Sequence, residues 1–426
     1  MITSVRMVNF KNFADETLKV GPFTVIVGAN ASGKSNIRDA FRFLHGIGRG
    51  YTLAEILGGR YGPGGQREWA GIRGAPNEIL RMCPASPGVP FWFSLGVELD
   101  SVETKTSYSI KVAFAPDSPD GFRLMDEELR VGLELVYKTV ESHDSLLKLP
   151  ADDTGKSWIE LSRSQPALAQ LSTTYSWRNL NARREFNNVL GKIRYLEFMP
   201  ERMREPSITG ASMLGDSGEN LPSVLEAICA DPQRGRNLMS WLQELTPMDV
   251  KDFDFPRDPS GRVHLHIVER NGRKVSAYSA SDGTLRFLGI LAALLGPNEG
   301  GLYFFEEIDN GIHPNRLWLL LDLIEQQTAE GNIQVVTTTH SPALLAWMSD
   351  TAFENTSVVY RDQYWADSVI RPIAGLFNLR ELREAKGLER LLTSGWFETA
   401  MKFSEGDSDS DHLDDDEDDW EQGVLE

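Results

Sequence analysis

The sequence predicts an α/β protein in which helices flank a mixed sheet and a further α/β lobe is inserted. An apolar run at 23–27, FTVIV, precedes a glycine-rich loop and then a helix with apolar residues at Ile37, Phe41 and Leu44. From Ser281 onward, helical and strand patterns alternate at 282–295, 302–305, 315–329 and 333–339. This alternation is typical of βαβ units and predicts parallel strands in the sheet.

The stretch between these two regions has a different pattern. Residues 89–99, 107–114 and 129–138 indicate antiparallel strands, and 158–190 indicate an interrupted helix. We therefore expect a discontinuous core at 1–50 and 262–402, with an inserted β and helical lobe at 51–261. The remaining segment, 403–426, is an acidic low-complexity tail that we expect to be disordered.

Composition limits the class of protein. The 426 residues are 41% hydrophobic, and the net charge of −19 falls to −7 when the twelve acidic residues of the tail are set aside. The two cysteines, Cys83 and Cys229, are far apart, which excludes a disulfide scaffold and a cysteine zinc site and suits a reducing cytosol. With no apolar signal region and no long apolar run, we expect a cytoplasmic protein without a membrane partner.

Residues 28–35 carry the clearest site motif. GANASGKS matches G-x-x-x-x-G-K-[ST], the Walker A loop, between a buried strand and a helix. Such a loop surrounds phosphate oxygens with backbone N–H groups, its lysine reaches the β- and γ-phosphates, and its hydroxyl binds Mg²⁺. We therefore predict a site for ATP and Mg²⁺, with the nucleotide-binding residues Gly28, Asn30, Ser32, Gly33, Lys34, Ser35 and Asn36.

Two glutamates follow the apolar strand LYFF at 302–305. A buried strand that ends in adjacent carboxylates is the Walker B pattern, in which the first acid holds Mg²⁺ and the second polarises the attacking water. On this basis Glu306 and Ser35 are the metal residues, and Glu307 acts in catalysis with Lys34. Aspartate is usual at the first position, so the longer Glu306 contacts the metal either directly or through water.

Two further helix starts point to the same site. Ser281 is placed to cap a long apolar helix, and the turn Ser281-Asp-Gly283 makes a second anion site, best used by another subunit. The strand 333–339 ends in His340, at an edge where a hydrogen-bond donor would lie near the γ-phosphate. We predict a catalytic role for His340 as well.

In order and spacing these motifs resemble those of ABC-type ATPases of the SMC, RecF and OLD kind. The resemblance covers NFKNF at 9–13, the Walker A loop with Asn36, SDGTLRFL at 281–288, EEIDNGIHP at 306–314 and TTTHSP at 337–342. It implies a head that dimerises head-to-tail around two ATP molecules. Ser281 and Gly283 would contact the γ-phosphate in trans, 309–311 would form the D-loop, and His340 the switch.

Departures from the family pattern indicate a subtype. The insertion has no heptads and no C-x-x-C hook, which argues against an SMC tether. Asp407, Asp409 and Asp411 follow no strand, so we predict no Toprim nuclease domain. The chain resembles stand-alone OLD-like ATPases of prokaryotic DNA maintenance and phage defence. That resemblance implies self-association, a separate effector such as a nuclease, and DNA as a possible partner.

The sequence leaves alternative functions and the roles of several residues open. The protein could be an ATP-dependent scaffold with little hydrolysis, or, with less support, the cassette of a transporter. The sequence does not place the Q-loop glutamine, for which Gln66 and Gln165 are candidates. His264 and His266 share a strand face but lack a third metal ligand, and the basic clusters at 178–186 and 200–207 could contact nucleic acid. The acidic tail is either solubilising or binds a basic surface.

Overall fold

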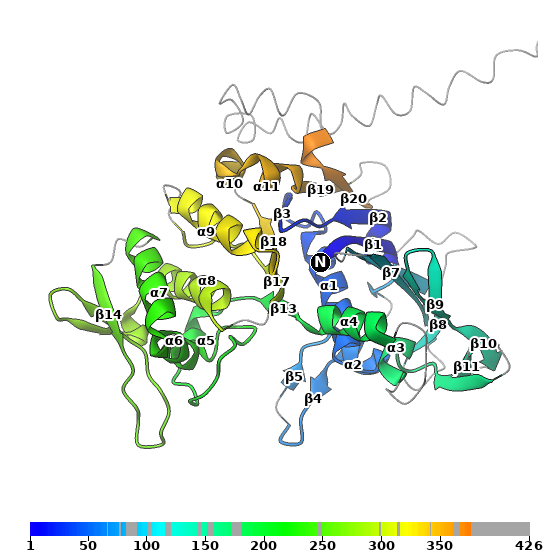
Figure 1. Ribbon diagram of the computed structural model, residues 1–426, viewed down its shortest axis with the longest axis horizontal. Helices are drawn as coiled ribbons and strands as arrows, with labels where there is room; N and C mark the ends of the chain where they lie inside the picture. The colour runs from blue at the N-terminus through cyan, green and yellow to red at the C-terminus, as the bar shows by residue number, and fades with distance from the viewer. Residues whose placement is uncertain are drawn as a thin grey trace, which may run out of the picture.

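The computed structural model places two lobes around a central sheet (Figure 1). It describes residues 1–65, 67–75, 78–81, 92–100, 104–115, 121–143, 146–150, 157–171, 180–245, 249–297, 300–312, 316–340, 342–361 and 367–375. The tail at 403–426, including Asp407, Asp409 and Asp411, lies outside these residues, as do Gln66 and the part of the expected core at 376–402.

The central sheet is mixed, as the sequence predicts. Its strands lie in the order β13 (Ile193–Leu196), β17 (Gly301–Phe305), β18 (Ile333–Thr339), β3 (Phe23–Val27), β19 (Ser357–Arg361) and β20 (Ser368–Pro372). All neighbouring pairs are parallel except β19 and β20. The edge strand β13 comes from within the segment 51–261.

This sheet is buried on both faces. Leu302 and Phe304 of β17 belong to one hydrophobic cluster, whereas Tyr303 and Phe305 belong to the other. Alternate residues of a strand point to opposite faces, so the sheet separates two cores. Strands buried on both faces are expected to be continuous apolar runs, which is why they are visible in the sequence.

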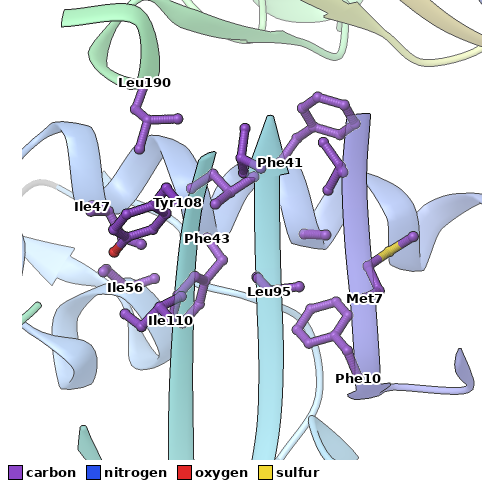
Figure 2. Packing of buried hydrophobic residues seen from close by; sticks show 14 of the residues in the cluster. Met7, Phe10, Phe41, Phe43, Ile47, Ile56, Leu95, Tyr108, Ile110 and Leu190 are labelled. Atoms are coloured by element: carbon purple, nitrogen blue, oxygen red, sulfur yellow. The ribbon is translucent and has the colours of Figure 1, made fainter. Parts of the chain in front are cut away.

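The first core lies between the central sheet and an antiparallel sheet. That sheet has the strand order β2 (Phe13–Lys19), β1 (Ile2–Phe10), β6 (Trp92–Asp100), β7 (Lys105–Phe114), β8 (Phe122–Val131) and β9 (Glu134–Lys138). Helix α1 (Lys34–Gly48) fills the space between the sheets, with Phe43 against Phe93 and Phe41 against Phe304 at centroid separations of 5.4 and 5.5 Å. Figure 2 shows this packing, including Met7, Phe10 and Leu95. The helix that follows the phosphate loop is thus fixed on both sides.

Smaller elements complete this side of the molecule. They are the helices α2 (Leu53–Gly58), α3 (Ala167–Gln170) and α4 (Leu180–Gly191), the hairpin β4 (Arg60–Tyr61) and β5 (Arg67–Trp69), and the sheet β10 (Val140–His143), β11 (Leu146–Pro150) and β12 (Trp158–Ser162). The expectation of helix from residue 158 is wrong for 158–162, because β12 pairs with β11.

The second core lies on the opposite face of the central sheet. Helix α8 (Asp282–Leu295) packs there with α5 (Pro200–Met203), α6 (Leu221–Ala230), α7 (Pro232–Leu245) and the sheet β14 (Val250–Asp254), β15 (His266–Glu269) and β16 (Lys274–Ser276). The helices α9 (Leu317–Ala329), α10 (Pro342–Trp347) and α11 (Asp350–Glu354) and the short turns Ala277–Ser279 and Ile373–Gly375 complete the fold. None of the described helices is long and apolar enough to cross a membrane.

Candidate nucleotide site

The loop between β3 and α1 depends on its glycines. Gly33 has φ 116°, and a Cβ there would lie 2.6 Å from Ser368 Oγ. A Cβ on Gly28 would lie 2.3 Å from the carbonyl oxygen of Val359. The loop therefore lies directly against β19 and β20. Replacing Gly28 would require backbone to move, and replacing Gly33 would strain a left-handed conformation and displace the Ser368 side chain.

The loop borders a cavity of about 680 Å³ at the carboxyl end of the parallel strands. The predicted residues that line it are Asn30, Ser32, Gly33, Lys34, Ser35, Asn36, Glu306, Glu307 and His340. Gly28 shapes the loop from behind and is not among the lining residues. The structure therefore brings together residues that are up to 310 positions apart in the sequence.

Lys34 closes the loop on itself. Its Nζ donates to the carbonyl oxygens of Gly28 and Ala29 at 2.5 and 2.7 Å and lies 3.3 Å from His340 Nδ1. Burial lowers the pKa of Lys34 to about 8, and the charge of Glu307 opposes that shift. The ammonium is held at the loop's carbonyls, at the place where phosphate oxygens would compete for it.

Glu307 is held in a conformation that is unusual for its residue type. Its φ is 48°, in the left-handed region, which costs energy for a residue with a side chain and is often found at functional sites. Its N–H donates to Thr338 Oγ1 at 3.1 Å. Its carboxylate accepts from Asn310 Nδ2 at 3.3 Å and lies 3.2 Å from His340 Nε2. One backbone contact and two carboxylate contacts thus hold Glu307 at the cavity.

His340 connects the lysine to the glutamate. Its Nδ1 lies 3.3 Å from Lys34 Nζ, and its Nε2 lies 3.2 Å from Glu307 Oε1, so one ring faces both functional side chains.

Glu306 forms an ion pair with Arg38. Its Oε2 lies 2.7 Å from Arg38 Nη1, and the two side chains are 20% and 7% exposed. Ser35 and Glu306 are oxygen donors that line the same cavity as the loop. Two protein oxygens suit Mg²⁺, which usually keeps several of its waters.

A second hydrogen-bond network, which the sequence motifs do not indicate, contacts the phosphate loop. Asn36 Nδ2 donates to Asn12 Oδ1 at 2.6 Å, Asn12 Nδ2 donates to Ser368 Oγ, and Ser368 Oγ donates to the carbonyl oxygen of Ser32. Asn12 lies in the NFKNF motif, but nothing local in the sequence marks Ser368.

The start of α8 lies outside this chain's own nucleotide cavity. Ser281 Oγ caps the helix by accepting from Thr284 N at 3.2 Å. A Cβ on Gly283 would lie 2.4 Å from the carbonyl oxygen of Gly311, so this turn packs on the segment 309–311. Asp282 pairs with Arg204 at 2.6 Å and lines a second cavity of about 670 Å³, which Glu306 and Glu307 also border.

The remaining candidates lie away from the cavity. Gln165 donates to the carbonyl oxygen of Gly50 at 2.8 Å. His264 and His266 each face an aspartate, and the described part of the chain has no group of three metal-ligating residues of the His, Cys, Asp and Glu types. Of the basic clusters, Arg183 is buried and Arg204 is used by Asp282.

A protein-family model matches the chain at residues 23–91 and 231–346. It is an AAA domain whose description names the AbiEii toxin and type IV TA systems. The two segments hold the phosphate loop, the start of α8 and the strand β17 that precedes Glu306. Over these segments, which make up less than half of the chain, the sequence is similar to this family.

Among solved structures, the chain is similar to three SMC heads. An SMC head bound to the C-winged helix domain of ScpA has 15% identity, covers 87% of this chain and 97% of its own, and has a TM-score of 0.47. The SMC head domain from Thermotoga maritima has 12% identity, coverages of 87% and 98%, and a TM-score of 0.42. The Pyrococcus furiosus SMC head with an extended coiled coil, bound to the C-terminal domain of ScpA, has 12% identity and a TM-score of 0.48. The match covers 90% of this chain and 99% of that chain. No curated protein matches the sequence.

Proposed function

We propose that this protein hydrolyses ATP and that two copies associate around the nucleotide. The observation that carries the proposal is the placement of Glu307. The backbone of Glu307 has a positive φ, and its carboxylate lies between His340 and Asn310. It lines the same cavity as the phosphate loop.

In the proposed reaction the phosphates of ATP lie along 28–35, and Lys34 leaves the loop carbonyls for the β- and γ-phosphates. Glu307 accepts a proton from a water whose oxygen bonds to the γ-phosphorus. The bond from that phosphorus to the bridging oxygen breaks, which leaves ADP and phosphate. Ser35 and Glu306 would hold Mg²⁺, which neutralises charge on the β- and γ-oxygens.

Self-association explains why Ser281 and Gly283 lie outside their own chain's cavity. A second copy placed head-to-tail brings this helix start to the γ-phosphate, where the N–H groups of a helix N-terminus stabilise an anion. We assign the protein to control of a separate effector, such as a nuclease, or to DNA-related work in phage defence or repair. The family description, which names a toxin system, supports the first assignment.

The test compares wild type with Glu307→Gln. We expect the variant to lose at least about 100-fold in kcat, the usual size of a general-base contribution, while it still binds ATP. Light scattering should show a larger species for the variant with ATP and Mg²⁺ than without them. Glu330→Gln, at an exposed glutamate after α9, is the matched control and should behave as wild type.

The alternative function is an ATP-dependent scaffold. If neither wild type nor Glu307→Gln turns over ATP and both assemble equally without it, hydrolysis is excluded and the scaffold function replaces it.

A further inference from the structure

Arg38 is a buried cation next to the proposed metal site. It lies on α1, one turn after Lys34, and its side chain is 7% exposed. Its Nη1 donates to Glu306 Oε2 at 2.7 Å, a short charge-assisted hydrogen bond. One oxygen of Glu306 therefore already has a partner within the protein.

Arg38 also has other partners within reach. Its Nη1 is 3.8 Å from Glu197 Oε2, its Nε is 3.5 Å from Asp39 Oδ1, and its guanidinium lies 5.3 Å from the centre of the Tyr195 ring. Glu197 follows β13 and Glu306 follows the adjacent parallel strand β17. One arginine thus lies among three carboxylates, only one of which is a proposed metal ligand.

A guanidinium and Mg²⁺ compete for Glu306. The metal demands oxygen ligands at about 2.0–2.1 Å in near-octahedral geometry, and a positive charge hydrogen-bonded to the same carboxylate opposes its approach. We propose that Arg38 is a positioning residue that occupies Glu306 until the nucleotide brings Mg²⁺, and that Glu197 and Asp39 then retain the released guanidinium. This inference rests on the proposed function.

The exchange of partners connects the two cavities. Glu306 lines both of them, whereas Glu197 lines the second one, together with Asp282 and Asn310. Movement of Arg38 toward Glu197 therefore shifts positive charge toward the side of the molecule that carries the start of α8. Mg²⁺ binding at the phosphate loop would thereby change the charge at the surface that is proposed to meet a second copy.

The test measures binding of a fluorescent ATP analogue as Mg²⁺ is titrated. We expect Arg38→Gln to lower the half-saturating Mg²⁺ concentration about ten-fold, because a hydrogen bond between charged groups no longer opposes the metal. Arg38→Lys, which keeps the charge, should restore much of the wild-type Mg²⁺ requirement. An unchanged or higher half-saturating concentration in Arg38→Gln would overturn the inference.

Arg42→Gln is the matched control. Arg42 is one turn further along α1, equally buried, and stacks on Trp69 and Tyr195 at 4.8 and 5.4 Å. The substitution Arg42→Gln removes the same charge from the same helix without affecting a contact of Glu306, so the half-saturating Mg²⁺ concentration should stay at the wild-type value. A ten-fold decrease in this control as well would show a general charge effect and overturn the role of Arg38.

A second variant covers the case in which Arg38→Gln does not fold. Glu306→Asp shortens the side chain by about 1.5 Å, which weakens its contact with Arg38, and it too should lower the half-saturating Mg²⁺ concentration. A higher value would contradict the inference. If wild type binds no nucleotide with or without Mg²⁺, the proposed function itself fails, and the inference with it.

Discussion

Lys34 directs its hydrogen-bond donors to groups of the protein itself. Gly28, Ala29 and His340 take the three contacts of its ammonium, and burial holds its pKa at about 8. Phosphate oxygens would replace the loop carbonyls and stabilise the charged form, which raises the pKa again. Binding of ATP should therefore be coupled to uptake of a proton by this one residue.

The sign of the coupling gives a pH dependence. Below pH 8, Lys34 is already protonated in both the free protein and the ATP complex, so its titration leaves ATP affinity unchanged. Above pH 8 the free protein loses the proton that the complex keeps, so ATP affinity should fall by up to about ten-fold per pH unit. Calorimetry at pH 8.5 in two buffers of different ionisation enthalpy should show proton uptake. Lys34→Arg, which does not titrate in this range, should show none.

At the scale of elements, one buried glutamate of β8 accepts hydrogen bonds from the short helix α3. Glu127 accepts from Tyr137 OH at 2.7 Å and from the backbone N–H groups of Ala167 and Leu168 at 2.5 and 2.7 Å. Burial raises the pKa of Glu127 to about 7, against the opposing effect of these donors. The contact ties a segment of the inserted lobe to the antiparallel sheet that also packs on α1.

This pKa shift predicts how stability depends on pH. The folded protein binds the proton of Glu127 more tightly than the unfolded chain, so this contribution is complete below about pH 4.5 and is lost as pH rises through 7. It amounts to about 3 kcal/mol. Urea unfolding followed by circular dichroism should give a weaker pH dependence for Glu127→Gln between pH 5 and 8. Glu134→Gln, at an exposed glutamate of β9, should keep the wild-type dependence.

The elements that were predictable share a physical property. The strands β3, β17 and β18 are buried on both faces, and apolar residues and threonines make up nearly all of each strand. The helices α1 and α8 follow loops with strong turn residues. The segment WIELS at 158–162 has no such run; its pairing with β11 overrides the helical pattern. Long-range partners were also invisible: the contacts of Ser368 with Ser32 and of Arg38 with Glu306 depend on strand order, which no local pattern contains.

At the scale of the whole molecule, the central sheet separates the two halves of the proposed site. The phosphate loop leads into α1 on one core, and Ser281 opens α8 on the other. Neither Ser281 nor Gly283 lines the cavity of its own chain. A head-to-tail pair would therefore build each complete site from the loop of one copy and the α8 start of its partner.

Mixing two inactive variants tests this arrangement. Ser281→Arg should keep single-site ATP binding but lose ATP-dependent assembly, since the added side chain blocks the partner's γ-phosphate; loss of the cap costs only about 1 kcal/mol. Lys34→Met should lose ATP binding. Neither variant alone should assemble, whereas an equimolar mixture forms one intact site per pair, from the loop of the first and the α8 start of the second. Light scattering should then show dimers only in the mixture, and no recovery on mixing would exclude a composite site.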